Sequence, residues 1–102
     1  MFNVNQYILE NRQPGGFVSI KLCKDGFSIS IQASKYHRSS KSGENRDLYD
    51  TVECRFPTEI PDNIMEYCED PDEPLDTVYN YVPVKLVEEL IDYHNYYHNN
   101  RV

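Results

Sequence analysis

Two runs of alternating apolar and polar residues lie on either side of Lys24-Asp25-Gly26, at residues 17–22 and 27–33. A period of two is typical of half-buried β-strands. Asp-Gly readily adopts the positive φ angles that a tight hairpin turn requires. The pattern therefore predicts an antiparallel β-hairpin. Its core-facing side chains are expected to be Val18, Ile20, Leu22, Phe27, Ile29, Ile31 and Ala33, and its outward-facing ones Ser28, Ser30 and Gln32.

Two more strands and two short helices follow from the rest of the chain. Residues 48–56 alternate around Val52 and Cys54, and residues 77–82 are β-branched and aromatic, so each predicts a strand. A helix is predicted at residues 3–12, because Asn3 is a suitable N-cap. A further short helix is predicted at residues 62–70, burying Ile64, Met65 and Cys68.

The strongest helix signal runs from Pro83 to about residue 98. Pro83 suits the first turn of a helix, because its missing N–H needs no partner there. One helical face carries an apolar stripe: Leu86, Val87, Leu90 and Ile91, extended by Tyr93, His94 and Tyr97. The polar side chains lie on or near the other face: Lys85, Glu88, Glu89 and Asp92. Together these elements predict one α+β domain, residues 1–102. In it a small antiparallel sheet of three to four strands packs the C-terminal helix on one face.

Charge divides this chain unevenly. The chain carries a net charge of −7, yet residues 57–84 hold eight acidic residues and no Lys or Arg, so this segment carries −8 and the remainder +1. The eight are Glu59, Asp62, Glu66, Glu69, Asp70, Asp72, Glu73 and Asp76. Folding alone does not require such crowding, because exposed positions can be mixed in sign. The alternative interpretation is a face that merely keeps the protein soluble.

A protein partner with a basic surface would turn this repulsion into attraction. Nearby tyrosines would add the apolar anchors that binding hot spots contain. The predicted contact residues are Glu66, Glu69, Asp70, Asp72, Glu73, Asp76, Tyr79 and Tyr81. The same surface repels nucleic acid, so no direct nucleic-acid binding is expected.

Residues 34–46 form the opposite pole, a predicted mobile loop rich in Ser, Gly and basic residues. Arginine forks and tyrosine rings are the groups that grip a phosphate-bearing ligand. The candidate ligand-binding residues are Tyr36, His37, Arg38, Lys41, Arg46 and Tyr49. The alternative is a flexible connection that its charges keep soluble.

Metal and nucleophilic chemistry have weaker signals. His94 and His98 share a helical face, as zinc ligands often do, but a structural zinc site needs about four ligands. Cys23, Cys54 and Cys68 are far apart in the sequence and odd in number, which suits buried thiols in a reducing compartment. A Cys/His catalytic pair has no further support. We therefore expect no metal, no cofactor and no catalytic residue.

The chain contains no run near the ~18 apolar residues of a membrane span. Its start lacks the basic and apolar regions of a signal peptide. These features predict a cytoplasmic protein without membrane contact, and they leave a homo-oligomer open.

Three stretches resemble a pattern in small uncharacterised bacteriophage and prophage accessory proteins. They are SISIQAS at residues 28–34 followed by Tyr36 and Arg38, TVECRFP at 51–57, and TVYNYVPVKLVEELIDYH at 77–94. The resemblance covers about residues 17–94. This chain departs from the pattern at His37, where such proteins often carry Pro before the Arg.

The resemblance implies a phage accessory protein that binds and blocks a host protein, as anti-CRISPR and other anti-defence proteins do. With the charge pattern, it predicts a non-enzymatic inhibitor whose acidic segment binds a basic host protein, such as a defence nuclease. The alternative is a small-ligand binder that sequesters a phosphate-bearing nucleotide signal through residues 34–46.

Overall fold

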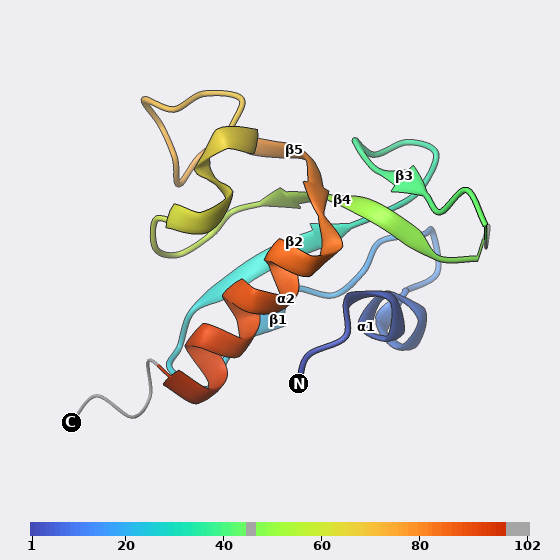
Figure 1. Cartoon of the computed structure of the whole chain (residues 1–102), viewed down its shortest axis with the longest axis horizontal. Helices are drawn as coiled ribbons and strands as arrows, with labels where there is room; N and C mark the ends of the chain where they lie inside the picture. The colour runs from blue at the N-terminus through green and yellow to red at the C-terminus, as the bar shows by residue number, and fades with distance from the viewer. Residues whose placement is uncertain (45–46, 98–102) are drawn as a thin grey trace.

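The computed structural model describes residues 1–44 and 47–97, with the side chain of Tyr97 left out. It confirms the α+β class, with an antiparallel sheet, a short N-terminal helix and a C-terminal helix (Figure 1). The helices are α1 (Val4–Asn11), the 3₁₀-helix η1 (Asp62–Tyr67), α2 (Val84–Asp92) and the π-helix η2 (Tyr93–Tyr97). The strands are β1 (Lys21–Leu22), β2 (Ser28–Gln32), β3 (Ser40–Lys41), β4 (Tyr49–Arg55) and β5 (Val78–Pro83).

Strand β4 is the centre of the sheet and pairs antiparallel with three strands. Thr51 is paired with Ser40 of β3 and Pro83 of β5, and Cys54 with Ile31 of β2 and Tyr79 of β5. Since a strand has two edges, β2 and β3 share one edge of β4 and β5 takes the other. The two-residue strand β3 lies within residues 34–46, which are therefore not the uninterrupted loop that the sequence predicted.

The hairpin is confirmed, with Lys21 opposite Ile29. Cys23 N donates to Phe27 O over 2.8 Å, and Gly26 has a φ of 94°. The predicted first strand is too long, however. Ile20 and Leu22 are exposed rather than core-facing, and only Val18 of that predicted face is buried.

A side chain of β2 explains this difference. The Gln32 amide accepts from Val18 N over 2.8 Å and donates to Val18 O over 2.7 Å, so it takes the place of a strand partner. The segment at Val18 thus covers the second face of β2. For this reason Ser30 and Gln32 are buried, although the alternation predicted that they face outward.

The core joins side chains from both helices and the sheet into one cluster. Figure 1 shows α2 crossing one face of the sheet and α1 beside it. The largest fully buried core side chains are Val4, Ile29, Ile31, Val52, Cys54, Ile64, Tyr79, Val82, Val87 and Ile91. Leu90 is also buried, as predicted.

The polar face of the C-terminal helix was predicted only in part. Asp92 is buried, because its Oδ1 accepts from Phe2 N over 2.8 Å, and Glu88 Oε2 accepts from Val4 N over 3.0 Å. These two carboxylates hold the start of α1 against α2. Tyr93, which was expected in the apolar stripe, is exposed instead. Within residues 1–44 and 47–97, no helix is both long enough and apolar enough to cross a membrane.

Candidate functional site

The acidic face consists of the eight carboxylate residues of residues 57–84. All eight are exposed: Glu59, Asp62, Glu66, Glu69, Asp70, Asp72, Glu73 and Asp76. They lie before and within η1 and on the loop that joins η1 to β5. Figure 1 shows this loop projecting from the sheet beside β5. Exposure of every member leaves the whole set accessible to a partner.

Hydrogen bonds within the loop fix its shape. Glu69 N donates to Val78 O over 3.0 Å, Glu73 N to Asp70 O over 3.0 Å, and Asp76 N to Glu73 O over 2.9 Å. The Thr77 hydroxyl accepts from Asp70 N over 3.1 Å. The backbone of the loop is therefore held in one conformation, which lowers the entropy that binding would cost.

Tyr79 is not part of this surface, although it was predicted as a partner contact. Its side chain is 0% exposed, and its hydroxyl donates to Pro74 O over 2.7 Å. Tyr79 thus packs beneath the loop that joins η1 to β5, here called the acidic loop, and supports it from the core. Sequence reasoning missed Leu75, which lies in the same loop and exposes its apolar side chain.

Of the two tyrosines predicted as partner contacts, Tyr81 is the exposed one. The register between β4 and β5 shifts after Tyr79, so Asn80 and Tyr81 together oppose Glu53 in a β-bulge. Tyr81 has a φ of 50° and is 48% exposed. Its N–H donates to Arg38 O over 2.9 Å, which joins β5 to the turn between β2 and β3.

The predicted ligand-binding residues divide into two groups. Tyr36, His37 and Arg38 lie on the turn between β2 and β3. There His37 Nδ1 lies 2.7 Å from Ser34 Oγ, and Arg38 N donates to Glu53 Oε1 over 3.1 Å. Tyr36 is 83% exposed, with Lys35 Nζ 5.1 Å from its ring centroid. Arg46 falls outside the described residues.

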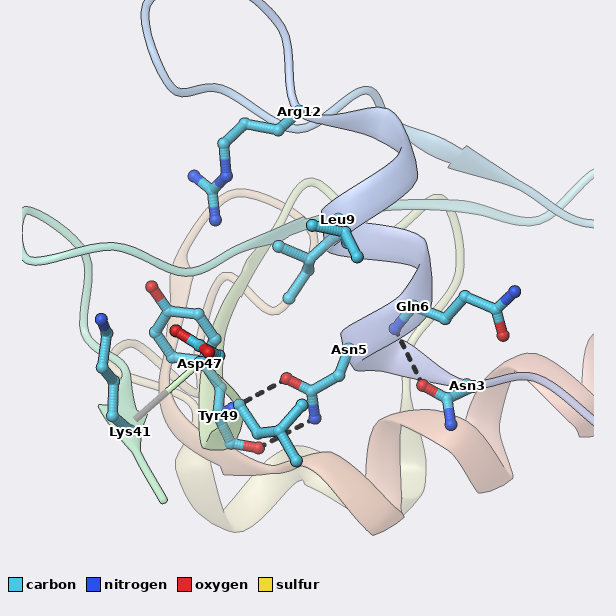
Figure 2. A pocket seen from close by; sticks show the side chains of 10 residues that line it. Asn3, Asn5, Gln6, Leu9, Arg12, Lys41, Asp47 and Tyr49 are labelled. Atoms are coloured by element: carbon cyan, nitrogen blue, oxygen red, sulfur yellow. Dashed lines mark hydrogen bonds between the residues drawn. The ribbon is translucent and has the colours of Figure 1, made fainter. Parts of the chain in front are cut away.

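Lys41 and Tyr49 instead line a groove of about 660 Å³ against α1, here called the α1 groove. Figure 2 shows Leu9 and Arg12 extending from the end of α1 toward the space beside Tyr49. Arg12 donates to Gly16 O over 2.7 Å and to Ala33 O over 2.9 Å, so its guanidinium is held in place. The full lining is Asn3, Asn5, Gln6, Ile8, Leu9, Arg12, Lys41, Asp47, Leu48 and Tyr49.

The groove is built by an amide side chain that extends the sheet. Asn5 Oδ1 accepts from Tyr49 N over 2.7 Å, and Asn5 Nδ2 donates to Tyr49 O over 3.1 Å. Both dashed contacts are visible in Figure 2. This pairing docks α1 on the end of β4. The sequence carried no signal for it, because residues 5 and 49 are far apart along the chain.

His94 has a partner that the sequence did not indicate. Its Nδ1 donates to Asp25 Oδ2 over 2.6 Å, and the two side chains are only 3% and 8% exposed. The imidazole also stacks on Phe27, with ring centroids 3.9 Å apart. This contact ties the hairpin turn to the C-terminal helix. His98, the other predicted candidate ligand, lies outside the described residues.

The thiols also lie in the core or beside it. Cys23 and Cys54 are buried and Cys68 is partly exposed. Desolvation by burial raises the pKa of Cys23 to about 11 and raises the pKa of Cys54 as well. Since the thiolate is the reactive form, both are poor nucleophiles near neutral pH. In the described part of the chain, no three His, Cys, Asp or Glu residues come together as a metal site would require.

The structure thus offers an ordered acidic face and a groove of mixed chemistry that contains two cations. No protein-family model, curated protein or solved structure matches this chain at a significant level.

Proposed function

We propose that this protein is a non-enzymatic binding protein that blocks a basic surface of a partner protein through its acidic face. The observation that carries the proposal is the exposure of all eight carboxylates in a segment without Lys or Arg. A charge field of one sign speeds encounter with a partner of opposite charge, and it disfavours wrong partners.

Apolar anchors supplement the charge. Tyr81 and Leu75 expose their side chains on β5 and on the acidic loop. Binding energy in protein interfaces concentrates in a few such side chains, surrounded by polar contacts that exclude water. The ordered loop supports the proposal because its shape is fixed before binding.

The resemblance to phage accessory proteins supports a more specific form of the proposal. In that form the partner is a host protein, such as a defence nuclease. The nucleic-acid groove of a nuclease is lined by Lys and Arg that neutralise phosphates. Carboxylates on a rigid loop can occupy the same positions as those phosphates and exclude the natural substrate.

The test is a charge reversal of three acidic-face residues, Glu66, Asp72 and Glu73, to Lys. Among the described residues, these three side chains make no hydrogen bond to the rest of the fold. The side chains of Asp70 and Glu69 are left unchanged, because they accept from Asp72 N and Asn80 Nδ2. The matched control reverses the exposed acids Glu10, Glu44 and Asp50, which lie outside residues 57–84. Each variant moves the net charge from −7 to −1.

Affinity capture from a host lysate, quantified by mass spectrometry, is the readout. The acidic-face variant should lose the dominant captured protein, and the control variant should retain it. Equal capture by both variants and the wild type would show that the acidic face is only a solubilising surface.

The α1 groove favours a second candidate function, the binding of a small phosphate-bearing ligand. Arg12 and Lys41 supply positive charge beside the Tyr49 ring, and the groove volume of about 660 Å³ falls in the range of small-molecule sites. Of the described residues, Tyr36, His37 and Arg38 do not line this groove. The relevant cations of this function are therefore Arg12 and Lys41 rather than Arg38.

Calorimetry with mono-, di- and cyclic nucleotides tests this second function. Lys41→Ala should abolish the binding heat, because it removes a cation that would pair with the phosphate. The substitution should leave the fold intact, since Lys41 is exposed and its Nζ lies 5.9 Å from the Tyr49 ring centroid. Lys85→Ala, which removes an exposed lysine of α2, is the matched control and should bind as the wild type does. Absence of heat with every nucleotide would remove this candidate.

A further inference from the structure

A second cavity, of about 440 Å³, lies between residues 59–63, which lead into η1, and the helices α2 and η2, at the edge of the acidic face. We propose that this α2 cavity receives an arginine side chain of the partner protein. The inference rests on the proposed function and names the residue type by which the partner is recognised. The cavity is lined by Glu59, Ile60, Asp62, Asn63, Glu89, Leu90, Tyr93 and His94.

The floor of the cavity is rigid. Leu90 and His94 are both buried there, and His94 is fixed by its 2.6 Å hydrogen bond to Asp25 and by its stacking on Phe27. Asn63 Nδ2 donates to Leu86 O over 2.9 Å, which holds η1 against α2. The two sides of the cavity are therefore kept at a set separation before any partner arrives.

The walls and the rim differ in chemistry. Ile60 and Tyr93 form exposed apolar and aromatic walls above the floor. Glu59, Asp62 and Glu89 carry exposed carboxylates around them, and none of the described lining residues is Lys or Arg. Glu89 belongs to α2, so the cavity joins a helix outside residues 57–84 to the acidic face.

This combination selects a cation with an apolar stem. The aliphatic part of a long basic side chain packs on Ile60 and Leu90, while its charged end reaches the carboxylates. Arginine fits better than lysine for two reasons. Its planar guanidinium stacks on an aromatic ring such as Tyr93 and binds a carboxylate through two parallel hydrogen bonds. It is also less strongly hydrated than an ammonium group, so it loses less on entering a partly enclosed site.

The test is a two-dimensional ¹⁵N–¹H NMR titration with the blocked peptide acetyl-Gly-Arg-Gly-amide. The same peptide with citrulline in place of arginine is nearly isosteric and uncharged. The arginine peptide should cause saturable shifts at the amides of Asn63, Glu89 and Tyr93, and the citrulline peptide should not.

A pair of variants tests the role of the rim. Glu89→Gln should weaken binding of the arginine peptide about fivefold, because it removes one charge-assisted contact. Asp50→Asn removes an exposed carboxylate that does not line the cavity and should leave the affinity unchanged.

Two results would overturn the inference: equal shifts with the citrulline peptide, or equal affinity of the Glu89→Gln and Asp50→Asn variants. The charge reversal of Glu66, Asp72 and Glu73 separates this failure from failure of the proposed function, since none of these residues lines the cavity. If the peptide fails to bind while that reversal still abolishes partner capture, the arginine site is wrong and the acidic face remains the contact.

Discussion

Tyr81 joins an exposed aromatic ring to a strained backbone. Its φ of 50° lies in the left-handed region, where glycine and asparagine are favoured and a bulky side chain is unusual. Strained residues persist where the surrounding structure holds them, and they gather at functional sites. At Tyr81 the bulge in β5 and the hydrogen bond to Arg38 O hold the conformation. The ring is exposed next to Asn80, whose Nδ2 donates to Glu69 Oε1 of the acidic face over 3.3 Å.

Tyr81→Asn should therefore separate stability from binding. Asparagine tolerates the left-handed conformation, so the free energy of unfolding should stay the same or rise by up to about 1 kcal/mol. Capture of the partner should weaken, because the aromatic anchor is lost. Phe56→Asn is the matched control, since Phe56 is also exposed with a φ of 55°. Urea denaturation and lysate capture measure the two effects, and weaker capture by both variants alike would contradict a specific role for Tyr81.

The three thiols should react in an order set by burial. Cys68 is partly exposed, whereas Cys23 has a pKa raised to about 11 by desolvation. A pKa two units above the ordinary 9.0 leaves about 100-fold less thiolate at pH 8. Labelling the native protein with iodoacetamide should therefore modify Cys68 first, and Cys54 only after denaturation. Peptide mapping by mass spectrometry reads the order, and early modification of Cys54 would contradict the packing described here.

At the scale of elements, one buried contact joins the hairpin to the C-terminal helix. Asp25 accepts from Phe27 N over 2.9 Å and from His94 over 2.6 Å, so a single carboxylate shapes the turn and holds the helix. His94 also lines the base of the α2 cavity. The position of the C-terminal helix, the shape of the hairpin turn and the shape of the cavity therefore all depend on Asp25 and His94.

His94→Phe should lower the free energy of unfolding by about 2–4 kcal/mol. The substitution keeps an aromatic ring on Phe27 but leaves the buried Asp25 carboxylate without this donor, and breaking one side of a buried polar pair is costly. Asp25→Asn and the double variant complete a cycle that isolates the interaction between the two residues. Urea denaturation measures all four proteins. If the losses in free energy of unfolding of the two single variants add up to that of the double variant, Asp25 and His94 do not stabilise the fold through their mutual contact.

Periodicity was sufficient to predict most of the elements and insufficient for the site. The alternation around Ile29 and Val52 predicts β2 and β4, and the β-branched and aromatic residues 77–82 predict β5. Gln32 and Asp92 do not follow the alternation of buried and exposed positions, since each is buried and binds a backbone group distant in sequence. The groove contact between Asn5 and Tyr49 has the same origin. Local patterns record which face is buried, and they do not record which distant group a polar side chain will meet.

At the scale of the whole molecule, the acidic face places like charges close together. Residues 57–84 carry a charge of −8 in a chain whose net charge is −7. All eight side chains are exposed, before and within η1 and on the loop that joins η1 to β5. Exposed like charges destabilise the folded state by small amounts per pair, and salt screens them with a Debye length of about 10 Å at 0.1 M and 3 Å at 1 M. Repulsion within the acidic face should therefore lower the free energy of unfolding by a measurable amount.

Sodium chloride should stabilise the wild type, raising its free energy of unfolding by about 1 kcal/mol between 0.02 and 0.5 M, on the scale of screened surface charges. The variant with Glu66, Asp72 and Glu73 changed to Lys should be at least as stable at low salt and should respond much less to added salt. The variant with Glu10, Glu44 and Asp50 changed to Lys has the same net charge of −1 but keeps all eight acidic-face residues, so it should retain most of the salt response. Urea denaturation at each salt concentration compares the three proteins. If both variants lose the response equally, total charge rather than the acidic face is the source of the repulsion.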